Sequence, residues 1–169
     1  MRTILTLVFT LVAAICSAQA LNTVPYVDIK KYSGLWYEIA HLPIKFQKGC
    51  TNTTAEYTLT DENYLIVKNT CLRNGQEAAV KGKAFVVKNS GNAKLRVQFF
   101  WPFKADYWIL ALDDDYNYAV IGNESRKNMW ILSRSPVLDN LILQSLLTEM
   151  KVKAFPVEEL TFTAHENEK

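Results

Sequence analysis

Few side chains of this sequence could act as nucleophiles or bind a metal ion. Beyond its first twenty residues the chain has two cysteines, Cys50 and Cys71, and two histidines, His41 and His165. Their spacing matches none of the short Cys/His repeats that hold zinc. Chemistry on a bound substrate needs a nucleophile or an acid–base group in a pocket, and a disulfide between the cysteines leaves no such set. The sequence therefore predicts no enzyme, no metal site and no cofactor.

Three consecutive aspartates at 113–115 are the other candidate for a cation site. Adjacent carboxylates in a short polar stretch are typical of tight turns, so we expect a turn there. The stretches that begin at Asn52 and Asn123 match the N-glycosylation sequon, a pattern too frequent by chance to establish a modification.

The first twenty residues predict a signal peptide. A basic residue precedes an apolar run, and the small-residue triplet at 18–20 forms a cleavage site. The run is too short to span a bilayer. Acylation of Cys16, as in a bacterial lipoprotein, is the alternative, but Ile15 stands where such signals have Gly or Ala. We expect cleavage after Ala20, a secreted or periplasmic domain over 21–169 and, in that oxidising compartment, a disulfide.

Charge excludes one class of partner. Without the signal segment the 19 basic residues become 18, against 17 acidic ones, for a formal charge of +1. No basic stripe runs along the chain, so nucleic acid is excluded as a partner.

Short strands separated by polar turns fill most of the remaining chain. Such a pattern favours an antiparallel sandwich or barrel over alternating strands and helices. The expected strands are 34–42, 51–60, 63–72, 77–87, 93–100, 105–112, 117–123 and 127–134, with a short last strand at 160–164. A helix is expected over 137–150, after the start signal Ser135-Pro136. Its apolar face would comprise Leu138, Leu141, Ile142, Ser145, Leu146 and Met150.

Alternation assigns several small or polar side chains to the inner face of the strands. These are Ala55, Asn69, Gly82, Ala84, Ala111 and Ala119. Small side chains among Tyr57, Tyr107 and Trp130 suggest an open cavity, because an eight-stranded barrel has room for a small ligand. The alternative is a filled core in which the alanines pack opposite the aromatics, since cavities cost stability. Periodicity alone leaves both interpretations open.

Three stretches resemble the signature motifs of the lipocalin family. They are Gly34-Leu35-Trp36 followed by YEIA, ALDDDYNYAVI at 111–121, and WILSRSP at 130–136. Their order and separations fit the family, and the resemblance covers essentially the whole chain after the signal segment. It is closest to the branch of apolipoprotein D and the bacterial outer-membrane lipocalins.

The resemblance implies an all-β fold, an eight-stranded antiparallel up-and-down barrel with the helix packed outside and a short final strand. Its signature positions here are Gly34, Trp36, Asp115, Tyr116 and Arg134. It implies that Gly34 lets the chain turn at the barrel floor, that Trp36 fills this floor and that Arg134 lies across the indole face. Glu38 is expected to be a buried structural carboxylate near the floor.

In the lipocalin layout the Cys50–Cys71 bridge lies at the open mouth. Because the two cysteines are symmetric about the turn at 60–61, we expect them opposite each other on one hairpin. Two rim loops would carry apolar side chains, with lysines at their edges. These are 41–49, with Leu42, Ile44, Phe46, Lys45 and Lys48, and 99–104, with Phe100, Trp101, Phe103 and Lys104.

The resemblance implies a binding protein that carries or stores a small hydrophobic ligand of the fatty acid or lysophospholipid type. The expected ligand contacts are Tyr57, Asn69, Val97, Phe99, Tyr107 and Trp130. Asn69 should bond to a tyrosine, to water or to the ligand, because a buried amide without a partner is costly. Peripheral membrane contact through the rim and a homodimer are the further partners implied. Two alternatives remain: a lipid-modifying enzyme of this fold, and a filled barrel that binds another protein.

Overall fold

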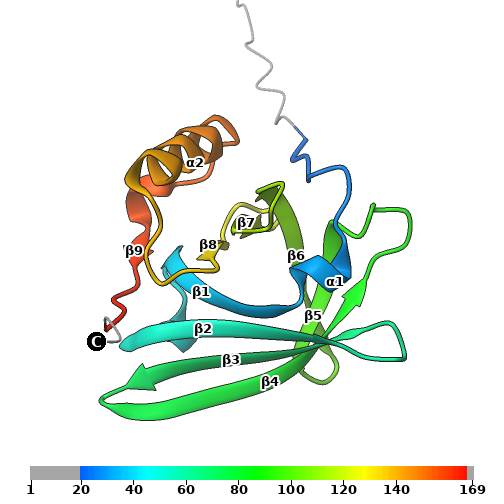
Figure 1. Ribbon diagram of the computed structural model, residues 1–169, viewed down its shortest axis with the longest axis horizontal. Coiled ribbons are helices and arrows are strands. Elements are labelled where there is room, and N and C mark those ends of the chain that lie inside the picture. Colours follow the sequence, from blue (N-terminus) through cyan, green and yellow to red (C-terminus); the bar gives the residue numbers. More distant parts are fainter. Residues whose placement is uncertain (1–19, 167–169) are drawn as a thin grey trace, which may run out of the picture.

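Eight antiparallel strands follow one another around a closed barrel in the computed structural model, which describes residues 20–166 (Figure 1). They are β1 (Gly34–His41), β2 (Cys50–Leu59), β3 (Leu65–Arg73), β4 (Gln76–Val86), β5 (Lys94–Phe100), β6 (Phe103–Leu112), β7 (Tyr118–Gly122) and β8 (Met129–Ser133). The barrel closes because β1 pairs with both β2 and β8. A two-residue strand, β9 (Thr161–Phe162), adds to β1. This confirms the fold expected from the sequence. The expected signal peptide and Cys16 fall outside the described residues.

Apolar side chains of the strands form two separate cores. One fills the barrel interior around Trp36, Leu65 and Leu95, which are fully buried. The other lies between the outer wall of the barrel and helix α2 (Asn140–Val152), around Ile131 and Met150. Where the outer face of a strand is polar, it can contact water directly. Part of the outer wall is apolar, and the helix covers that part. Figure 1 shows α2 outside the barrel, beside β8 and β9.

The helix starts later than the sequence predicted. Its N-cap is Asp139, whose carboxylate accepts hydrogen bonds from the backbone amides of Leu141 and Ile142. This cap, rather than Ser135-Pro136, satisfies the free amides of the first turn. Leu146 and Met150 are buried as expected. Leu141 is 80% exposed, so its assignment to the buried face was wrong.

The two ends of the barrel are built differently. The β2–β3, β4–β5 and β6–β7 turns lie at one end, which we call the floor, together with the short helix α1 (Ile29–Tyr32). The β1–β2, β3–β4, β5–β6 and β7–β8 connections lie at the opposite end, which we call the mouth. The β1–β2 connection includes a short 3-10 helix, η1 (Lys45–Gln47), and a second one, η2 (Val157–Glu159), precedes β9.

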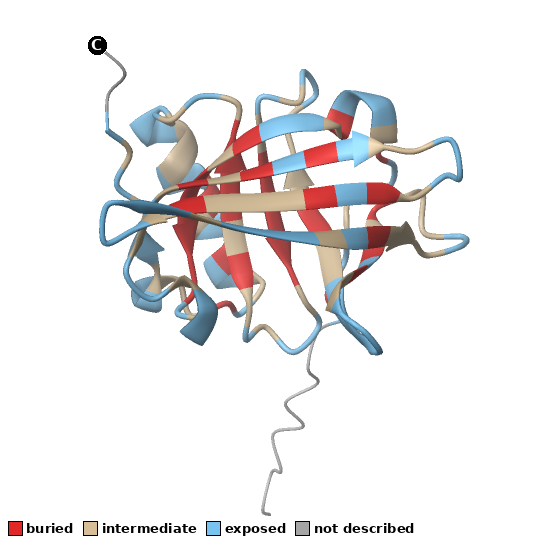
Figure 2. Cartoon of the chain, turned by 90° about the horizontal axis from the view of Figure 1, so that it is seen from below, coloured by how far each residue is buried: buried red, intermediate tan, exposed pale blue. Residues whose placement is uncertain are grey.

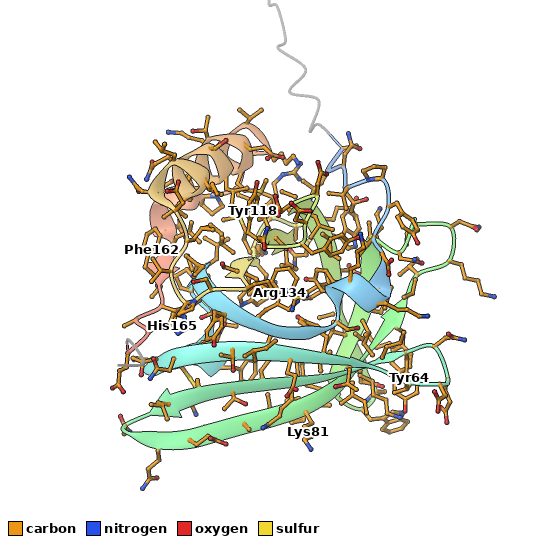
Figure 3. The ribbon with its side chains drawn as sticks, viewed as in Figure 1. Tyr64, Lys81, Tyr118, Arg134, Phe162 and His165 are labelled. Atoms are coloured by element: carbon orange, nitrogen blue, oxygen red, sulfur yellow. A yellow bond between two sulfur atoms is a disulfide. The ribbon has the colours of Figure 1, made fainter. Side chains whose placement is uncertain are left out.

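Arg134 ties the elements of the floor together. Its guanidinium carbon lies 3.8 Å from the centre of the Trp36 indole ring, which confirms the expected stacking. The same side chain donates hydrogen bonds to the backbone oxygens of Lys31, Tyr32, Ser33, Leu35 and Tyr116, at 2.6–3.3 Å. One cation therefore joins α1, the start of β1 and the β6–β7 turn to the end of β8. Figure 3 labels Arg134 beside β1.

Two further signature positions have a local reason for their residue type. Gly34 has a φ of +97°, a conformation that side chains with a Cβ rarely adopt. Tyr116 has a φ of +63°, and its hydroxyl accepts a hydrogen bond from the Asp28 amide (2.8 Å). In the expected turn at 113–115 the carboxylate of Asp113 accepts both hydrogen bonds from Asn117. Asp115 is exposed and makes no hydrogen bond with the described residues.

Replacing the arginine tests how much the floor depends on it. Arg134→Ala removes the indole contact and leaves several carbonyl oxygens without a donor. We expect the free energy of unfolding to fall by roughly 2–4 kcal/mol, measured by urea denaturation. The matched control is Arg96→Ala, which removes a surface ion pair with Asp106 (3.3 Å) and should cost less than about 1 kcal/mol. Equal losses in the two variants would contradict the proposed role of Arg134.

Candidate functional site

The barrel interior changes from buried to exposed between the floor and the mouth. Along the inner face of β4, Ala84 is fully buried, Gly82 is half-buried and Val80 is 38% exposed. On the inner face of β3, Leu65 is fully buried and Asn69 is half-buried. Solvent therefore reaches inward-facing side chains from the mouth, and Figure 2 shows the exposed half of β4 on the side of the β3–β4 turn. We call the mouth half of the interior the chamber.

At two positions the small side chains do not leave the empty space inside the barrel that we predicted from the sequence. A Cβ at Gly82 would lie 2.7 Å from the Phe99 ring and 2.6 Å from the backbone oxygen of Gln98, so Phe99 occupies the space that the glycine leaves. A β-bulge between Ile109 and Ala111 turns Ala111 to the outer wall, so its inward assignment was wrong. It borders a hollow of about 400 Å³ between α2 and the barrel. The floor half of the interior is thus a filled core, and the filled-core interpretation is correct for that half.

Three tyrosines meet between the filled half and the chamber. The hydroxyl of Tyr107 lies 2.7 Å from that of Tyr32 and 2.7 Å from that of Tyr57. We call these residues the tyrosine cluster. Tyr32 and Tyr57 are almost fully buried, with their rings 5.5 Å apart, whereas Tyr107 is half-buried and borders the chamber. The sequence placed Tyr57 and Tyr107 inside the barrel but missed Tyr32, because it stands on α1 and not on a strand.

Burial shifts the ionisation of all three hydroxyls. Desolvation raises the pKa of Tyr32 and of Tyr107 well above the ordinary value of 10.0, and it raises the pKa of Tyr57 as well. The phenolate form would lose its hydration in this interior, whereas the neutral form keeps its hydrogen bonds. The cluster therefore stays protonated and can donate hydrogen bonds at neutral pH.

Two polar side chains of the interior have an oxygen without a partner. Asn69 Oδ1 and Thr53 Oγ1 are buried and form no hydrogen bond with the described residues. The neighbouring tyrosines, one of the three partners expected for Asn69, bond to one another instead. Thr53 shares the inner face of β2 with Ala55 and Tyr57, and it was not singled out from the sequence.

A chain of polar contacts links Trp130 at the mouth to the C-terminal strand. The indole of Trp130 donates to Gln47 Oε1 (3.1 Å), and Gln47 in turn donates to the carboxylate of Glu38. Thr163 also donates to Glu38 (2.6 Å). Glu38 is only 4% exposed, so it is a buried structural carboxylate as expected, but these contacts lie toward the mouth rather than at the floor. Gln47 gave no sequence signal, because only the fold of the β1–β2 loop turns it inward.

Both histidines are engaged in backbone hydrogen bonds. His41 Nδ1 donates to the oxygen of Leu42 (2.8 Å), and its Nε2 lies 3.9 Å from Glu38 Oε1. His165 Nε2 donates to the backbone oxygen of Glu38 (2.7 Å). His165 and Phe162 lie along the C-terminal segment beside β1 in Figure 3.

The expected disulfide is present at the mouth. Cys50 and Cys71 are bonded, with their Cα atoms 5.5 Å apart. They are not direct partners in the β2–β3 ladder, because Cys50 pairs with Arg73 and a bulge lies between Thr51 and Thr54. The symmetric hairpin expected from the sequence was therefore wrong in register, although the pairing was right. Arg73 donates to the oxygen of Phe46 (2.6 Å), which holds the β1–β2 loop to the bonded hairpin.

Exposed aromatic side chains lie on the β1–β2 and β5–β6 connections at the mouth. Phe46 is 80% exposed, Trp101 86% and Phe103 77%, and Phe100 is exposed as well. We call these four residues the aromatic rim. Leu42 was expected among them but packs under α2 and is 2% exposed.

The residues expected to contact a ligand divide into two groups. Asn69, Phe99, Tyr107 and Trp130 are half-buried and border the chamber, whereas Tyr57 and Val97 are buried in the interior. Within residues 20–166 the structure has no group of three His, Cys, Asp or Glu side chains that could hold a metal ion. No helix in that part of the chain is long and apolar enough to cross a membrane.

Comparison with known proteins identifies relatives over most of the chain. Residues 27–165 match the family model described as a lipocalin-like domain. The chain is 36% identical to the outer membrane lipoprotein Blc of Citrobacter freundii, over 79% of this chain and 76% of that protein. It is 34% identical to apolipoprotein D of Bos taurus, over 83% of this chain and 78% of that protein. Among solved structures, insecticyanin from the tobacco hornworm Manduca sexta superposes with a TM-score of 0.72 at 22% identity, covering 87% and 85% of the two chains.

The tyrosine cluster predicts how stability depends on alkaline pH. Above the ordinary pKa of 10.0 the unfolded chain loses tyrosine protons that the folded chain retains, so the free energy of unfolding should fall as pH rises. Below that pKa the contribution is fully present. Urea denaturation between about pH 8 and about pH 11.5 measures the slope of the free energy of unfolding against pH.

Tyr107→Phe removes one of the shifted groups and should reduce that slope. The matched control is Tyr64→Phe, which removes a tyrosine hydroxyl of the outer face, where the ring packs on Phe85, and keeps the three hydroxyls of the cluster. A slope that is the same in all three proteins would contradict the pKa shifts.

Proposed function

The chain belongs to the lipocalin family, and from that premise we propose that it binds, transports or stores a small hydrophobic ligand in the chamber. One observation carries the proposal: inward-facing side chains are buried at the floor and accessible at the mouth. A barrel that served only as a scaffold would gain stability by filling both halves. The accessible half is lined by Phe99, Tyr107, Trp130 and Asn69, a mainly apolar wall with few polar groups, as in small-molecule sites.

We propose that the ligand has an acyl chain, as in a fatty acid or a lysophospholipid. Each buried methylene contributes about 0.8 kcal/mol, so an acyl chain can bind with few polar contacts. Its charged head group would stay at the mouth, where Lys45 and Lys48 are exposed on the β1–β2 loop and Lys104 lies near the start of β6. Tyr57 and Val97 would form the deep wall of the same site.

The side chains that could act as nucleophiles, acids or bases are already bonded to other groups of the protein, which favours binding over catalysis. Both cysteines that could act as nucleophiles are bonded to each other. The two histidines donate to backbone oxygens, and Glu38 already accepts from Gln47 and Thr163. None of these groups faces the chamber as a free acid, base or nucleophile. A secreted or periplasmic location, with cleavage after Ala20, belongs to the same proposal and agrees with the disulfide.

The aromatic rim is proposed to contact an anionic lipid surface from which the ligand enters. Exposed aromatic side chains at an open mouth are suited to the interfacial region of a bilayer, and the neighbouring lysines are suited to its negative charge. The rim lies on two of the four connections at the mouth, so a membrane bound to it would lie at the open end of the chamber.

Trp130 provides the assay for the chamber. Titration with octadecanoate or its lysophosphatidylcholine should quench or shift tryptophan emission, because the Trp130 indole borders the space that the acyl chain of the ligand would fill. Trp130→Phe should remove most of the change. Trp101→Phe, at the rim, is the matched control and should leave most of it. If the effects of the two substitutions are reversed, the ligand is held only at the mouth and the chamber proposal fails.

A second measurement tests the rim. The double variant Trp101→Ser/Phe103→Ser should bind phosphatidylglycerol vesicles at least about tenfold more weakly than the wild type, since each buried aromatic ring contributes about 1.5–3 kcal/mol. Leu141→Ser is the matched control, because Leu141 is 80% exposed but lies on α2, away from the mouth. If the double variant instead abolishes a dimer seen by gel filtration and leaves vesicle binding unchanged, the rim is a dimer surface and the lipid contact is refuted.

A further inference from the structure

The tyrosine cluster has one more hydrogen-bond donor than its internal contacts use. Three hydroxyl groups carry three protons, and the cluster contains two hydrogen bonds, both at Tyr107. Among the described residues these hydroxyls have no other hydrogen-bond partner. Whichever way the two bonds are oriented, one proton remains to be donated. A buried hydroxyl with nothing to donate to is costly, so the cluster is suited to an acceptor from outside the protein.

The cluster reaches the deep end of the chamber through Tyr107. Tyr107 is the half-buried member of the cluster, whereas Tyr32 and Tyr57 are buried beneath it. Val67, the cross-strand partner of Tyr57, lies two residues before Asn69 on β3. Asn69 is therefore the next inward position of β3 toward the mouth, and its Oδ1 is an acceptor without a donor. The cluster and Asn69 thus both belong to the inner face of the barrel.

The cluster does not offer a site for a negative charge. No Lys, Arg or His side chain of residues 20–166 is hydrogen-bonded to any of its hydroxyls. On the floor, Arg134 stacks on Trp36 and is bonded to backbone oxygens, and it makes no hydrogen bond to the three tyrosine hydroxyls. A carboxylate or phosphate placed here would be desolvated without a counter-ion, which is strongly unfavourable. A neutral oxygen, which can accept from tyrosine without that penalty, fits the site.

We propose that the tyrosine cluster binds a neutral oxygen, a hydroxyl or a ketone, carried on the buried part of the acyl chain. The preferred ligands are then acyl lipids oxygenated toward their tails, with the charged head group at the mouth and the second oxygen at the cluster. This inference rests on the proposed function and specifies the ligand class of the same chamber.

Calorimetric titration with a positional series tests the inference. The probes are octadecanoate and hydroxyoctadecanoates that carry the hydroxyl at successive carbons of the distal half. We call the carbon whose hydroxyl reaches the tyrosine cluster the matching position. With the hydroxyl at this carbon, the wild type should bind the hydroxylated acid about five- to tenfold more tightly than the plain acid, which is the effect of one added hydrogen bond. In Tyr107→Phe this ratio should fall to near one at every position. Tyr64 is labelled in Figure 3, and Lys83 Nζ lies 4.7 Å from the centre of its ring on the outer face. In Tyr64→Phe the ratio should stay as in the wild type.

The outcomes separate this inference from the proposed function. If no octadecanoate binds, the proposed function fails and the inference fails with it. If the plain acid binds but no hydroxyl position gains affinity, the inference is overturned while the proposed function stands. A gain that persists in Tyr107→Phe overturns it as well, because the oxygen would then be bound elsewhere.

A spectroscopic readout needs only the wild-type protein, so it holds even if Tyr107→Phe does not fold. A ketooctadecanoate with a carbon-13 carbonyl at the matching position should show a C=O stretching frequency lower than in hydrocarbon solvent, because tyrosine donates to it. An unshifted frequency in the complex overturns the inference.

Discussion

The contact between Arg134 and Trp36 closes one end of the barrel, and the organisation of the chamber depends on this closure. An open-ended barrel would admit water along its whole length, and the apolar interior would lose its driving force for burial. Trp36 fills the narrow end, and its indole N–H donates to the oxygen of Tyr32 (2.8 Å). The guanidinium covers the outer face of the ring and bonds to the chain segments around it. Because α1 is held in this way, Tyr32 is fixed beneath the chamber.

The barrel therefore combines a rigid half and an accessible half in a single sheet. The same strands supply both, since the inner residues of β3 and β4 are buried near the floor and accessible near the mouth. The accessible half gains little from a packed core, and other contacts hold it together. The disulfide bonds β2 to β3, Arg73 holds the β1–β2 loop, and Gln47 ties that loop to Trp130 and Glu38. These contacts hold the strands and the loop of the mouth together.

Polar groups inside an apolar barrel specify orientation more than affinity. An acyl chain provides binding energy along its whole length but fixes neither its depth nor its direction. Hydrogen bonds do fix position, because they act only at short range and in defined directions. In the proposed site the tyrosine cluster would provide such a point at the deep end, Asn69 a second one nearer the mouth, and lysines charge at the mouth itself. A ligand with one polar group at each end would satisfy both.

The sequence by itself determined the strands and most of their inward faces, because alternation is a local pattern, and the Gly34, Trp36 and Arg134 motifs carried the family resemblance that implied the floor. It could not determine where alternation breaks: bulges moved Ala111 outward and shifted Cys50 out of register with Cys71. It also could not show that Phe99 fills the space at Gly82 or that Gln47 turns inward. Only the tertiary structure decided that Tyr32, Tyr57 and Tyr107 meet, since they come from α1, β2 and β6. The physical reason is that strand periodicity is set within each segment, whereas contacts between distant segments depend on how the barrel closes.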